Sequence, residues 1–405
     1  MKILPFTLIW YVMFITLHAQ NITTIDLTKA KFGEVPASRI FEDVKYIRLE
    51  THKDGLLNVN WAHFYLTDKF IVAINGFSPV YLFDRETGAF VREVSSKGRG
   101  PDEYLSHFYL SYGFDETNNT IFTRDDSKVN SDNVVVTRSW KCINILTNKV
   151  ESIFYAPLSE NNQEIFAIHA PWFIKENVYI SYCNNISGKN RVKLVVFDKE
   201  GNLIKKYPNY AEYEKKKSIS MPAMSGIFYY YHGQTYFKEH NYIDTVFRVD
   251  EYSMSPHIVF KLGNKQPSYY HQNNGNYNKE KYLIRFVYES DSFVLFNFYY
   301  YTETITNYFG EVTGINGTTH TGYYDKKSKQ AYISSTPDYK KSGYAATGLP
   351  ISFYPTVMNK NNEMITKIDP ALLWQHKDKI DPKYRQLFQD IQEDDNPIVV
   401  IAKLK

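Results

Sequence analysis

The sequence predicts an all-β fold, namely a six-bladed β-propeller with a seven-bladed ring as the alternative, and three observations lead to this prediction. Tyr and Phe are abundant, with 35 and 27 residues in a chain of 405, and aromatic side chains suit the pleated, half-buried surface of a sheet. Short units of strand, polar turn and strand recur without interleaved helices. Strand-like segments lie near both ends, where a ring of blades has to be closed.

The hairpin is the clearest repeated unit. Residues 80–84 are apolar up to Asp84, the following turn contains Gly88, and residues 89–94 resume the strand pattern. Apolar alternation around Asp, Asn or Gly is typical of a β-hairpin, and glycine accepts the positive φ of such turns without steric cost. The same pattern predicts hairpins at residues 194–207, 142–154 and 322–334. Counting such units gives about six blades.

Other segments have strand character but lack a recognisable turn. Their apolar and β-branched residues predict strands between the hairpins. These segments are residues 70–74, 120–123, 177–182, 245–249 and 293–301.

Ring closure is predicted from the two ends of the chain. Residues 44–49 and residues 398–402 both have the apolar pattern of a strand. A propeller joins its last blade to its first, and an unpaired final strand would leave an exposed sheet edge. We therefore expect these two segments to pair within one sheet.

Two segments depart from the hairpin pattern. Asp381 followed by Pro382 is typical of an N-cap and first helical residue, and predicts a short C-terminal helix packed on the last blade. The apolar stripe of this helix consists of Tyr384, Leu387, Phe388 and Ile391. Glycines 310, 314 and 317, interspersed with threonines, indicate a flexible polar loop.

The first residues predict export. Lys2 precedes an apolar stretch of residues 3–17, and Ala19 offers a cleavage site, so residues 1–19 are predicted to be a signal peptide and residues 20–405 the propeller domain. An uncleaved anchor is the alternative. No Cys lies near the cut, so a lipoprotein is not expected, and no later apolar stretch predicts a transmembrane helix. The expected location is the periplasm or the outside of the cell.

Charge and cysteine content exclude some classes of partner. The chain has 47 basic and 44 acidic residues, for a net charge of +3, and it lacks the basic patch that nucleic-acid binding requires. Cys142 and Cys183 are the two cysteines. They either pair in an oxidising compartment or remain separate buried thiols, and no metal site is expected from them.

The most distinctive motif spans residues 97–104, from Lys97 to Tyr104. Gly98 and Gly100 flank Arg99, and Pro101 follows, which predicts a tight turn after a strand. This turn would present Arg99 to an anion or to an internal carboxylate. It is not a phosphate-binding glycine loop, because Pro101 lacks an N–H donor and Glu103 repels anions.

On these residues the chain resembles the exported six-bladed β-propellers of Bacteroidetes, a domain of unknown function related to NHL-type and TolB-like propellers. Asp102 is a departure, since relatives often have glycine there, and many relatives carry the lipid-acceptor Cys that this chain lacks. The resemblance implies a six-bladed fold over the mature chain and carries no established catalytic residues. The matching segments are residues 46–51, Phe83-Asp84 with Gly88, residues 98–104, residues 245–249 and residues 395–397.

The sequence limits the classes of function that we expect but does not identify a single one. Metalloprotease, hydrolase-elbow, Walker and EF-hand motifs are absent. We expect a binding or scaffold protein of the envelope whose partner is a glycan, a peptide or another envelope protein, because tyrosines stack on sugars and propellers present loops around one face. A metal-assisted lyase or hydrolase acting at the central channel and a purely structural role are the alternatives, and the cofactor stays unknown. The candidate site residues are Arg99, Glu103, Tyr104, His169 and Trp172; for Arg99 and Glu103 the competing interpretation is an internal ion pair.

Overall fold

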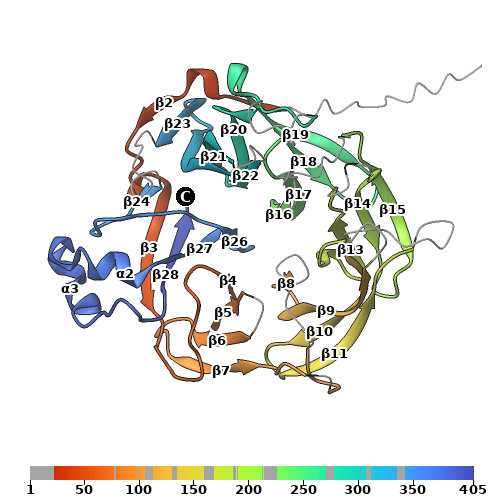
Figure 1. The fold of residues 1–405 in the computed structure, drawn as a ribbon, viewed down its shortest axis with the longest axis horizontal. Helices are drawn as coiled ribbons and strands as arrows, with labels where there is room; N and C mark the ends of the chain where they lie inside the picture. The colour runs from red at the N-terminus through yellow and green to blue at the C-terminus, as the bar shows by residue number, and fades with distance from the viewer. Residues whose placement is uncertain are drawn as a thin grey trace, which may run out of the picture.

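The computed structural model describes residues 22–405, apart from residues 77–78, 99, 105–112, 130–134, 159–167, 186–187, 189, 212, 214–225, 271–277, 307–311 and 335–342. Its strands form six blades arranged in a ring (Figure 1). The predicted six-bladed propeller is confirmed. The predicted signal peptide and Arg99 both lie outside the described residues.

Blades 1 to 3 are four-stranded antiparallel sheets whose strands follow the chain order from the centre outwards. Blade 1 contains β4 (Ala62–Leu66), β5 (Phe70–Asn75), β6 (Val80–Asp84) and β7 (Phe90–Val94). Blade 2 contains β8 (Gly113–Asp115), β9 (Thr120–Val129), β10 (Val135–Asn144) and β11 (Lys149–Tyr155). Blade 3 contains β12 (Trp172–Lys175), β13 (Val178–Tyr182), β14 (Val192–Phe197) and β15 (Leu203–Pro208).

Blades 4 and 5 have the same antiparallel core plus a fifth, parallel strand from the N-terminal segment. Blade 4 contains β16 (Gly226–Tyr231), β17 (Gln234–Glu239), β18 (Thr245–Val249), β19 (Met254–Lys261) and β1 (Thr23–Asp26). Blade 5 contains β20 (Tyr282–Glu289), β21 (Phe293–Thr306), β22 (Val312–Asp325), β23 (Gln330–Ser334) and β2 (Lys31–Gly33).

Blade 6 closes the ring by joining the two ends of the chain. It contains β26 (Val357–Met358), β27 (Glu363–Ile368), β28 (Ile398–Leu404) and β3 (Phe41–Arg48). β28 and β3 are antiparallel, with Val400 opposite Tyr46 and Ile398 opposite Arg48. The predicted pairing of the terminal segments is thus confirmed.

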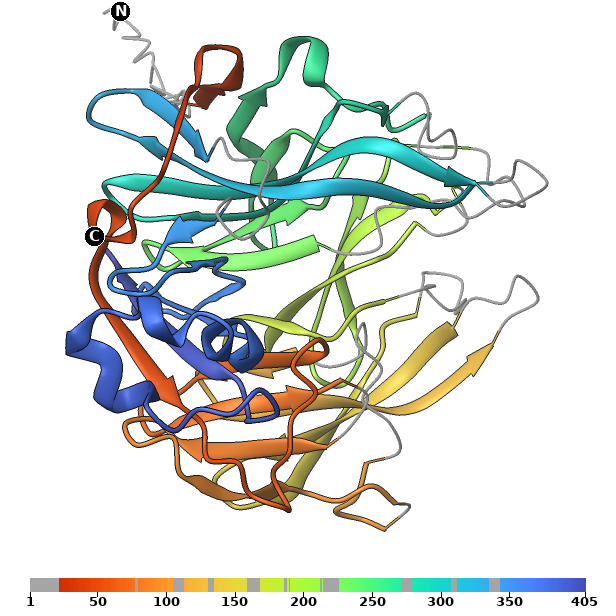
Figure 2. The ribbon, with the colours of Figure 1, turned by 60° about the vertical axis from the view of Figure 1, so that its left-hand side comes forward.

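The N-terminal segment forms a belt around three blades. It runs along the outer side of blades 4, 5 and 6 as β1, β2 and β3 (Figures 1 and 2). Ile25 of β1 is fully buried and Leu27 is 4% exposed, so the belt contributes apolar burial as well as backbone hydrogen bonds. Among the described residues, blades 1 to 3 have no fifth strand, and their outermost strands are β7, β11 and β15.

All four predicted hairpins join the third and fourth antiparallel strands of a blade, namely β6–β7, β10–β11, β14–β15 and β22–β23. The glycines of the first and third turns have positive φ, +75° at Gly88 and +83° at Gly201. A Cβ at Gly88 would stand 2.1 Å from the carbonyl oxygen of Arg48 on β3. This turn therefore needs glycine for its backbone conformation and for its contact with blade 6.

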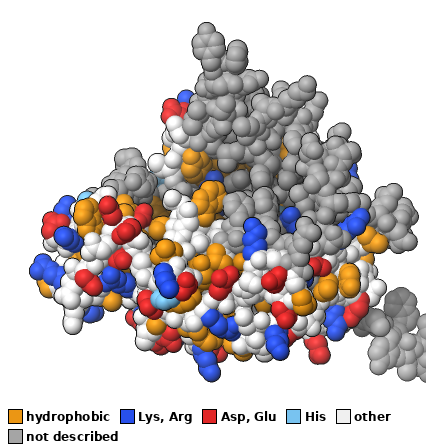
Figure 3. All heavy atoms as spheres, turned by 60° about the horizontal axis from the view of Figure 1, so that its bottom comes forward, with side chains coloured by type: hydrophobic (Ala, Val, Ile, Leu, Met, Phe, Trp, Pro, Cys, Tyr) orange, Lys and Arg blue, Asp and Glu red, His pale blue; other side chains and the backbone are white. Residues whose placement is uncertain are grey.

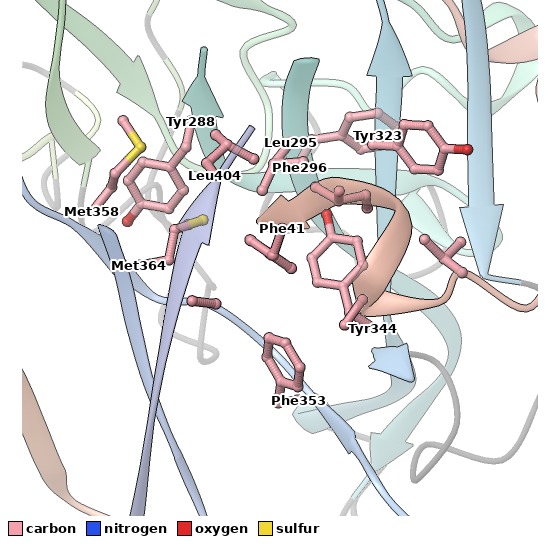
Figure 4. Packing of buried hydrophobic residues seen from close by; sticks show 14 of the residues in the cluster. Phe41, Tyr288, Leu295, Phe296, Tyr323, Tyr344, Phe353, Met358, Met364 and Leu404 are labelled. Atoms are coloured by element: carbon pink, nitrogen blue, oxygen red, sulfur yellow. The ribbon is translucent and has the colours of Figure 1, made fainter. Parts of the chain in front are cut away.

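Apolar side chains fill the space between neighbouring blades. Between blades 5 and 6, Phe41 of β3 packs edge-on against Tyr344 with ring centroids 5.5 Å apart (Figure 4). Phe353 and Met364 lie in the same cluster. Tyr344 and Phe353 belong to β24 (Tyr344–Ala345) and β25 (Ser352–Phe353), a small two-stranded sheet before blade 6.

The C-terminal helix is present as α3 (Pro382–Phe388), and the Asp381 carboxylate accepts a hydrogen bond from the Lys383 N–H as predicted for an N-cap. Tyr384 and Phe388 pack against Tyr46 of blade 6. Leu387, a member of the predicted stripe, is instead 38% exposed. Further short helices and 3₁₀ turns are η1 (Leu27–Lys29), α1 (Ala37–Ile40), η2 (Gly263–Lys265), α2 (Pro370–Trp374) and η4 (Lys377–Lys379).

The prediction of a flexible loop around residues 310–321 is wrong for the described part of that segment. Residues 312–325 are β22, the long partner of β21. Gly317 lies opposite Tyr301, and a Cβ at Gly317 would stand 2.2 Å from the Tyr300 carbonyl oxygen and 2.9 Å from the Tyr299 ring. This glycine, which as a residue type indicates flexibility, here lets two strands and a tyrosine ring pack closely.

Aromatic side chains connect the innermost strands around the centre of the ring. Tyr65 of β4 packs on Phe114 of β8 at 5.3 Å, and Trp172 of β12 packs on Phe228 of β16 at 5.7 Å. The Tyr288 hydroxyl on β20 donates a hydrogen bond to the Thr356 carbonyl beside β26. The centre is therefore bordered by packed rings.

Candidate functional site

The blades have two ends, and the longer connections emerge at one of them. In an antiparallel blade, the loop between the second and third strands and the connection to the next blade leave from the same end. We call this end the upper face and the opposite end the lower face. Glu103, Tyr104 and His169 lie in connections between blades, and Trp172 begins an inner strand, so all four belong to the upper face.

Glu103 holds the distinctive turn together. Its carboxylate accepts a hydrogen bond from the Gly100 N–H at 2.6 Å and lies 3.4 Å from the Ser96 hydroxyl. A Cβ at Gly98 would stand 1.9 Å from the same carboxylate. Both glycines are thus explained by the position of Glu103 within its own turn.

Tyr104 and the backbone on either side of Pro101 hold this turn in place. Tyr104 is 1% exposed and packs in the core between blades 1 and 2. Lys141 of β10 donates hydrogen bonds to the carbonyls of Gly100 and Glu103, at 3.2 and 2.7 Å, on either side of Pro101. For Glu103 and Tyr104 the described contacts are those of a structural turn.

His169 and Trp172 lie nearer the centre of the upper face. The His169 ring is 5.0 Å from Tyr182, edge to face. Trp172 stacks between blades 3 and 4, 4.9 Å from Tyr230 as well as against Phe228. The sequence candidates therefore come from two separate connections, β7–β8 and β11–β12.

A buried group of charged residues, which we call the charged cluster, lies where blades 3, 4 and 5 meet on the upper face. It consists of Lys193, Lys238, Glu239, His240 and Arg285. Lys193 is 7% exposed and Glu239 is 1% exposed, and they form an ion pair between β14 and the end of β17. Buried charges are costly unless they are paired and hydrogen-bonded. This pair therefore marks a site of specific geometry.

Lys238 is fully buried beside this pair. Its ammonium group donates hydrogen bonds to the carbonyl of Glu239 and, at 3.2 Å, to the carbonyl of Ile284 on β20. Desolvation lowers the pKa of Lys238 to about 7, against the opposing effect of Glu239 and Asp244. A lysine with a pKa near neutrality is a frequent property of functional sites.

His240 and Arg285 extend the cluster towards solvent, and both keep part of their surface exposed. Desolvation, followed by the charges of Lys238, Arg285 and His169, lowers the pKa of His240 well below its usual value. Its ring is therefore neutral at physiological pH. The Arg285 guanidinium lies 4.7 Å over the Tyr299 ring, and its Nε donates to Asn241 Oδ1 at 3.3 Å.

Tyrosines surround the charged cluster. The Tyr213 hydroxyl donates to the Asn185 carbonyl at 2.8 Å, and the Asn185 amide lies 3.3 Å from the Tyr269 hydroxyl. Burial raises the pKa of Tyr269, with a further contribution from the charge of Glu239. Next to these buried rings, Tyr210 and Tyr270 are 82% and 71% exposed. The upper face thus combines buried polar side chains with tyrosine rings that are exposed to solvent.

Sequence reasoning missed the charged cluster. Residues 238–241 are four consecutive polar residues directly after an apolar strand, which is the usual pattern of a solvated turn. Lys193 and Arg285 lie on other blades, so their proximity follows from the ring and not from spacing in the chain. The abundance of tyrosine was the one signal that pointed towards this face.

The two cysteines are separate in the structure. Cys142 and Cys183 are free and buried within the core between blades 2 and 3. Burial raises the pKa of the Cys142 thiol to about 12 and raises that of Cys183 further. Of the two sequence interpretations, the structure shows separate buried thiols.

Three further properties concern the described residues as a group. Within them, no three His, Cys, Asp or Glu side chains are placed to hold a metal ion. None of their helices is long and apolar enough to span a membrane. On the face in view in Figure 3, basic and acidic side chains are interspersed, in keeping with the net charge of +3.

Comparison with known families assigns the chain to one of them. Residues 22–403 match the model of DUF4934, a domain of unknown function. The match covers nearly the whole chain, so the protein belongs to this family. None of the curated proteins compared matches it.

Two solved structures share the fold. One is a protein of Bacteroides fragilis whose name calls it a candidate for export; it is 16% identical, with a TM-score of 0.65, and the match covers 95% of this chain and 100% of that one. The other is a member of the DUF4221 family from Bacteroides vulgatus, 9% identical with a TM-score of 0.53, covering 93% and 99%. These likenesses bear out the sequence resemblance to exported Bacteroidetes propellers, and at such low identity they show the fold alone.

Proposed function

We propose that the protein is a non-catalytic binding protein that works outside the cytoplasm and takes its ligand on the upper face, over blades 3, 4 and 5. The observation that carries the proposal is the pair of exposed rings, Tyr210 and Tyr270, beside the buried charged cluster. Flat, exposed tyrosines next to fixed polar groups are a frequent composition of recognition surfaces. The exported neighbour and the propeller fold agree with such a role.

The position of these tyrosines supports a shared site. Tyr210 follows β15, and the carbonyl of the next residue, Ala211, accepts a hydrogen bond from the Asn185 amide at 3.0 Å. Tyr270 follows Tyr269, whose hydroxyl lies against the same amide. Asn185 therefore ties the two connections that carry the exposed rings to one point of blade 3.

The test uses two sets of immobilised probes, an array of neutral and acidic oligosaccharides and an array of short peptides. Tyr210→Ala and Tyr270→Ala are compared with Tyr252→Ala, a matched control whose ring is 77% exposed in the β18–β19 turn on the lower face. We expect a ligand that the unchanged protein and the control retain, and that each upper-face variant binds about tenfold more weakly.

Binding that is insensitive to both upper-face substitutions, or equally weakened by Tyr252→Ala, would show that the site lies elsewhere. Cleavage of a retained oligosaccharide, followed by mass spectrometry, would contradict the non-catalytic part of the proposal and favour the enzyme alternative. Retention of the intact ligand over many hours supports a binding role.

A further inference from the structure

The inner turns of blades 2 and 6 touch each other on the lower face. Glu116 lies in the turn between β8 and β9, and Lys360 lies in the turn between β26 and β27. The two carboxylate oxygens of Glu116 accept from the Lys360 N–H, at 3.3 and 3.0 Å. Blades 2 and 6 are not neighbours, because blade 1 stands between them in the ring (Figure 1). This contact therefore joins two blades past the inner end of a third.

Asn359 fixes the turn that carries Lys360. The Asn359 side-chain oxygen accepts hydrogen bonds from the N–H groups of Asn361 and Glu363, at 3.0 and 2.9 Å. Its amide donates to Glu363 Oε2 at 2.8 Å, and the other oxygen of Glu363 pairs with Arg85 of blade 1. The Lys360 N–H is thus held in one direction by a braced turn, and its acceptor comes from another blade.

Further acidic groups lie around Glu116. Asp68, in the turn between β4 and β5 of blade 1, and Glu363 line the same open depression of about 520 Å³ on the lower face. Both carboxylates act on Glu116, whereas the charge of Lys360 opposes them. On the inner strand of blade 4, Tyr230 is a further titratable group within reach of Glu116. A negative charge on Glu116 is therefore placed among other negative charges at the centre of the lower face.

We propose that Glu116 is a pH-sensitive latch between blades 2 and 6, which closes on the Lys360 N–H when its carboxyl group is protonated and loosens when that group is ionised beside Asp68 and Glu363. A protonated carboxyl group keeps an oxygen that accepts the hydrogen bond. An ionised one is repelled by the neighbouring carboxylates and is better solvated in water. The latch lies on the lower face and does not depend on the proposed upper-face site.

Two effects oppose each other in this latch. An ionised carboxylate makes the stronger hydrogen bond to an N–H group, which favours closing at high pH. Burial, with the smaller contributions of Asp68 and Glu363, acts the other way and raises the pKa of Glu116 to about 7 although the Lys360 N–H lowers it. Burial and repulsion together therefore outweigh the stronger hydrogen bond, and the closed latch favours the protonated form.

The direction of the pH response follows from proton binding. The pKa of Glu116 is about 7 in the closed latch, and 4.5 is the ordinary value that we expect once the latch is open. Between these values the closed latch binds more protons than the open one, so closing is favoured as pH falls. From pH 8.5 to pH 5.5 the ratio of closed to open latch should rise by about 30-fold.

The experiment measures hydrogen–deuterium exchange of the Lys360 amide in the purified protein, by mass spectrometry of overlapping peptides at several pH values from 5.5 to 8.5. The protection factor, which is the ratio of intrinsic to observed exchange rate, should be at least tenfold higher at pH 5.5 than at pH 8.5. Glu116→Gln cannot ionise and should keep the high protection throughout this range. Glu116→Ala lacks the acceptor and should lose the protection at every pH.

Two further variants test the electrostatic part of the proposal. Asp68→Asn removes an exposed neighbouring charge and should move the midpoint of the pH response to lower pH. Glu86→Gln, which removes a 71% exposed carboxylate from the β6–β7 turn of the same face, is the matched control and should leave the midpoint in place.

Three results would contradict the latch. A protection factor of the unchanged protein that does not vary with pH overturns the proposal. An unaltered pH response in Glu116→Gln does the same, because another group would then be responsible. If Glu116→Gln fails to fold, Asp68→Asn still decides, and a midpoint equal to that of the Glu86→Gln control refutes the role of Glu116.

Discussion

The turn at Gly98 offers a quantitative test of the structure. Gly98 is not among the glycines with positive φ, and the three atoms nearest to a Cβ added at this position all belong to the Glu103 side chain, the first at 1.9 Å. Gly98→Ala must therefore either compress this contact or push the carboxylate away from the Gly100 N–H, which it binds at 2.6 Å. A hydrogen bond to a charged group contributes about 1.5–3 kcal/mol, so we expect Gly98→Ala to reduce the free energy of unfolding by about 2 kcal/mol.

The same substitution should have a different effect once Glu103 is shortened. In a Glu103→Ala background the methyl group that Gly98→Ala introduces has space, and the loss of glycine flexibility in the unfolded chain favours folding by about 0.4–1 kcal/mol. Urea unfolding of the two single variants and the double variant gives a coupling free energy, expected to be about 2 kcal/mol or more. Gly33→Ala is the control, because nothing lies within 4 Å of its Cβ position. Additive effects of the two substitutions would refute the steric explanation of this motif.

Two further predictions concern the belt and Lys238. Removing residues up to Gly33 deletes β1 and β2 and exposes the edges of β19 and β23. Because buried Ile25 and Leu27 are lost, the free energy of unfolding measured in urea should fall by about 3–6 kcal/mol. An unchanged unfolding midpoint would mean that the belt is not docked on blades 4 and 5. The pKa of Lys238 is about 7 in the folded state and 10.5 ordinarily. Between these values the unfolded chain binds more protons, so stability should rise with pH across this window, by at most about 5 kcal/mol, and the rise should be smaller in Lys238→Met.

The outer hairpins of the blades could be predicted from sequence because their turns are local. Asp84 accepts hydrogen bonds from the N–H groups of Glu86 and Thr87, and Gly88 completes the turn with a positive φ. A related turn follows Asp198, whose carboxylate accepts a hydrogen bond from the Asn202 N–H, and Gly201 again has a positive φ. A pattern of about five residues is enough to reveal such a turn.

The parallel belt strands could not be predicted in the same way. β1 has four residues and only Ile25 is buried, so its periodicity is too short to stand out. Its partner β19 lies far along the chain, with Ile25 opposite Phe260. The pairing depends on the curvature of the completed ring, which no local pattern encodes.

The sequence predicts the kind of candidate site, a tyrosine-rich recognition surface, but not where on the ring it lies. The excess of tyrosine indicates a recognition surface, and His169 does lie beside Tyr182 on the upper face. The string at residues 98–104 is the most distinctive motif, but its glycines are explained by Glu103 within the turn. A distinctive motif can thus be required by the geometry of its own turn. The charged cluster, by contrast, is assembled from three blades and carries no motif.

The ion pair at the centre of that cluster allows a last test of whether the site is kept for stability or for binding. Replacing a buried ion pair by hydrophobic residues of similar size is often neutral or stabilising by about 1–4 kcal/mol, whereas removing one partner costs about 3–5 kcal/mol. Lys193→Met/Glu239→Met should therefore fold at least as stably as the unchanged protein in urea, while Lys193→Met alone should be strongly destabilised.

The double variant also removes the Glu239 carboxylate, so it should lose affinity for whatever ligand the upper face takes although its fold is intact. A double variant that is as unstable as the single one would mean that the pair holds blades 3 and 4 together. Full stability with full binding would mean that the pair serves neither purpose. Full stability with lost binding is the outcome that the geometry predicts, because a propeller whose core already packs between every pair of blades does not need this buried charge to fold.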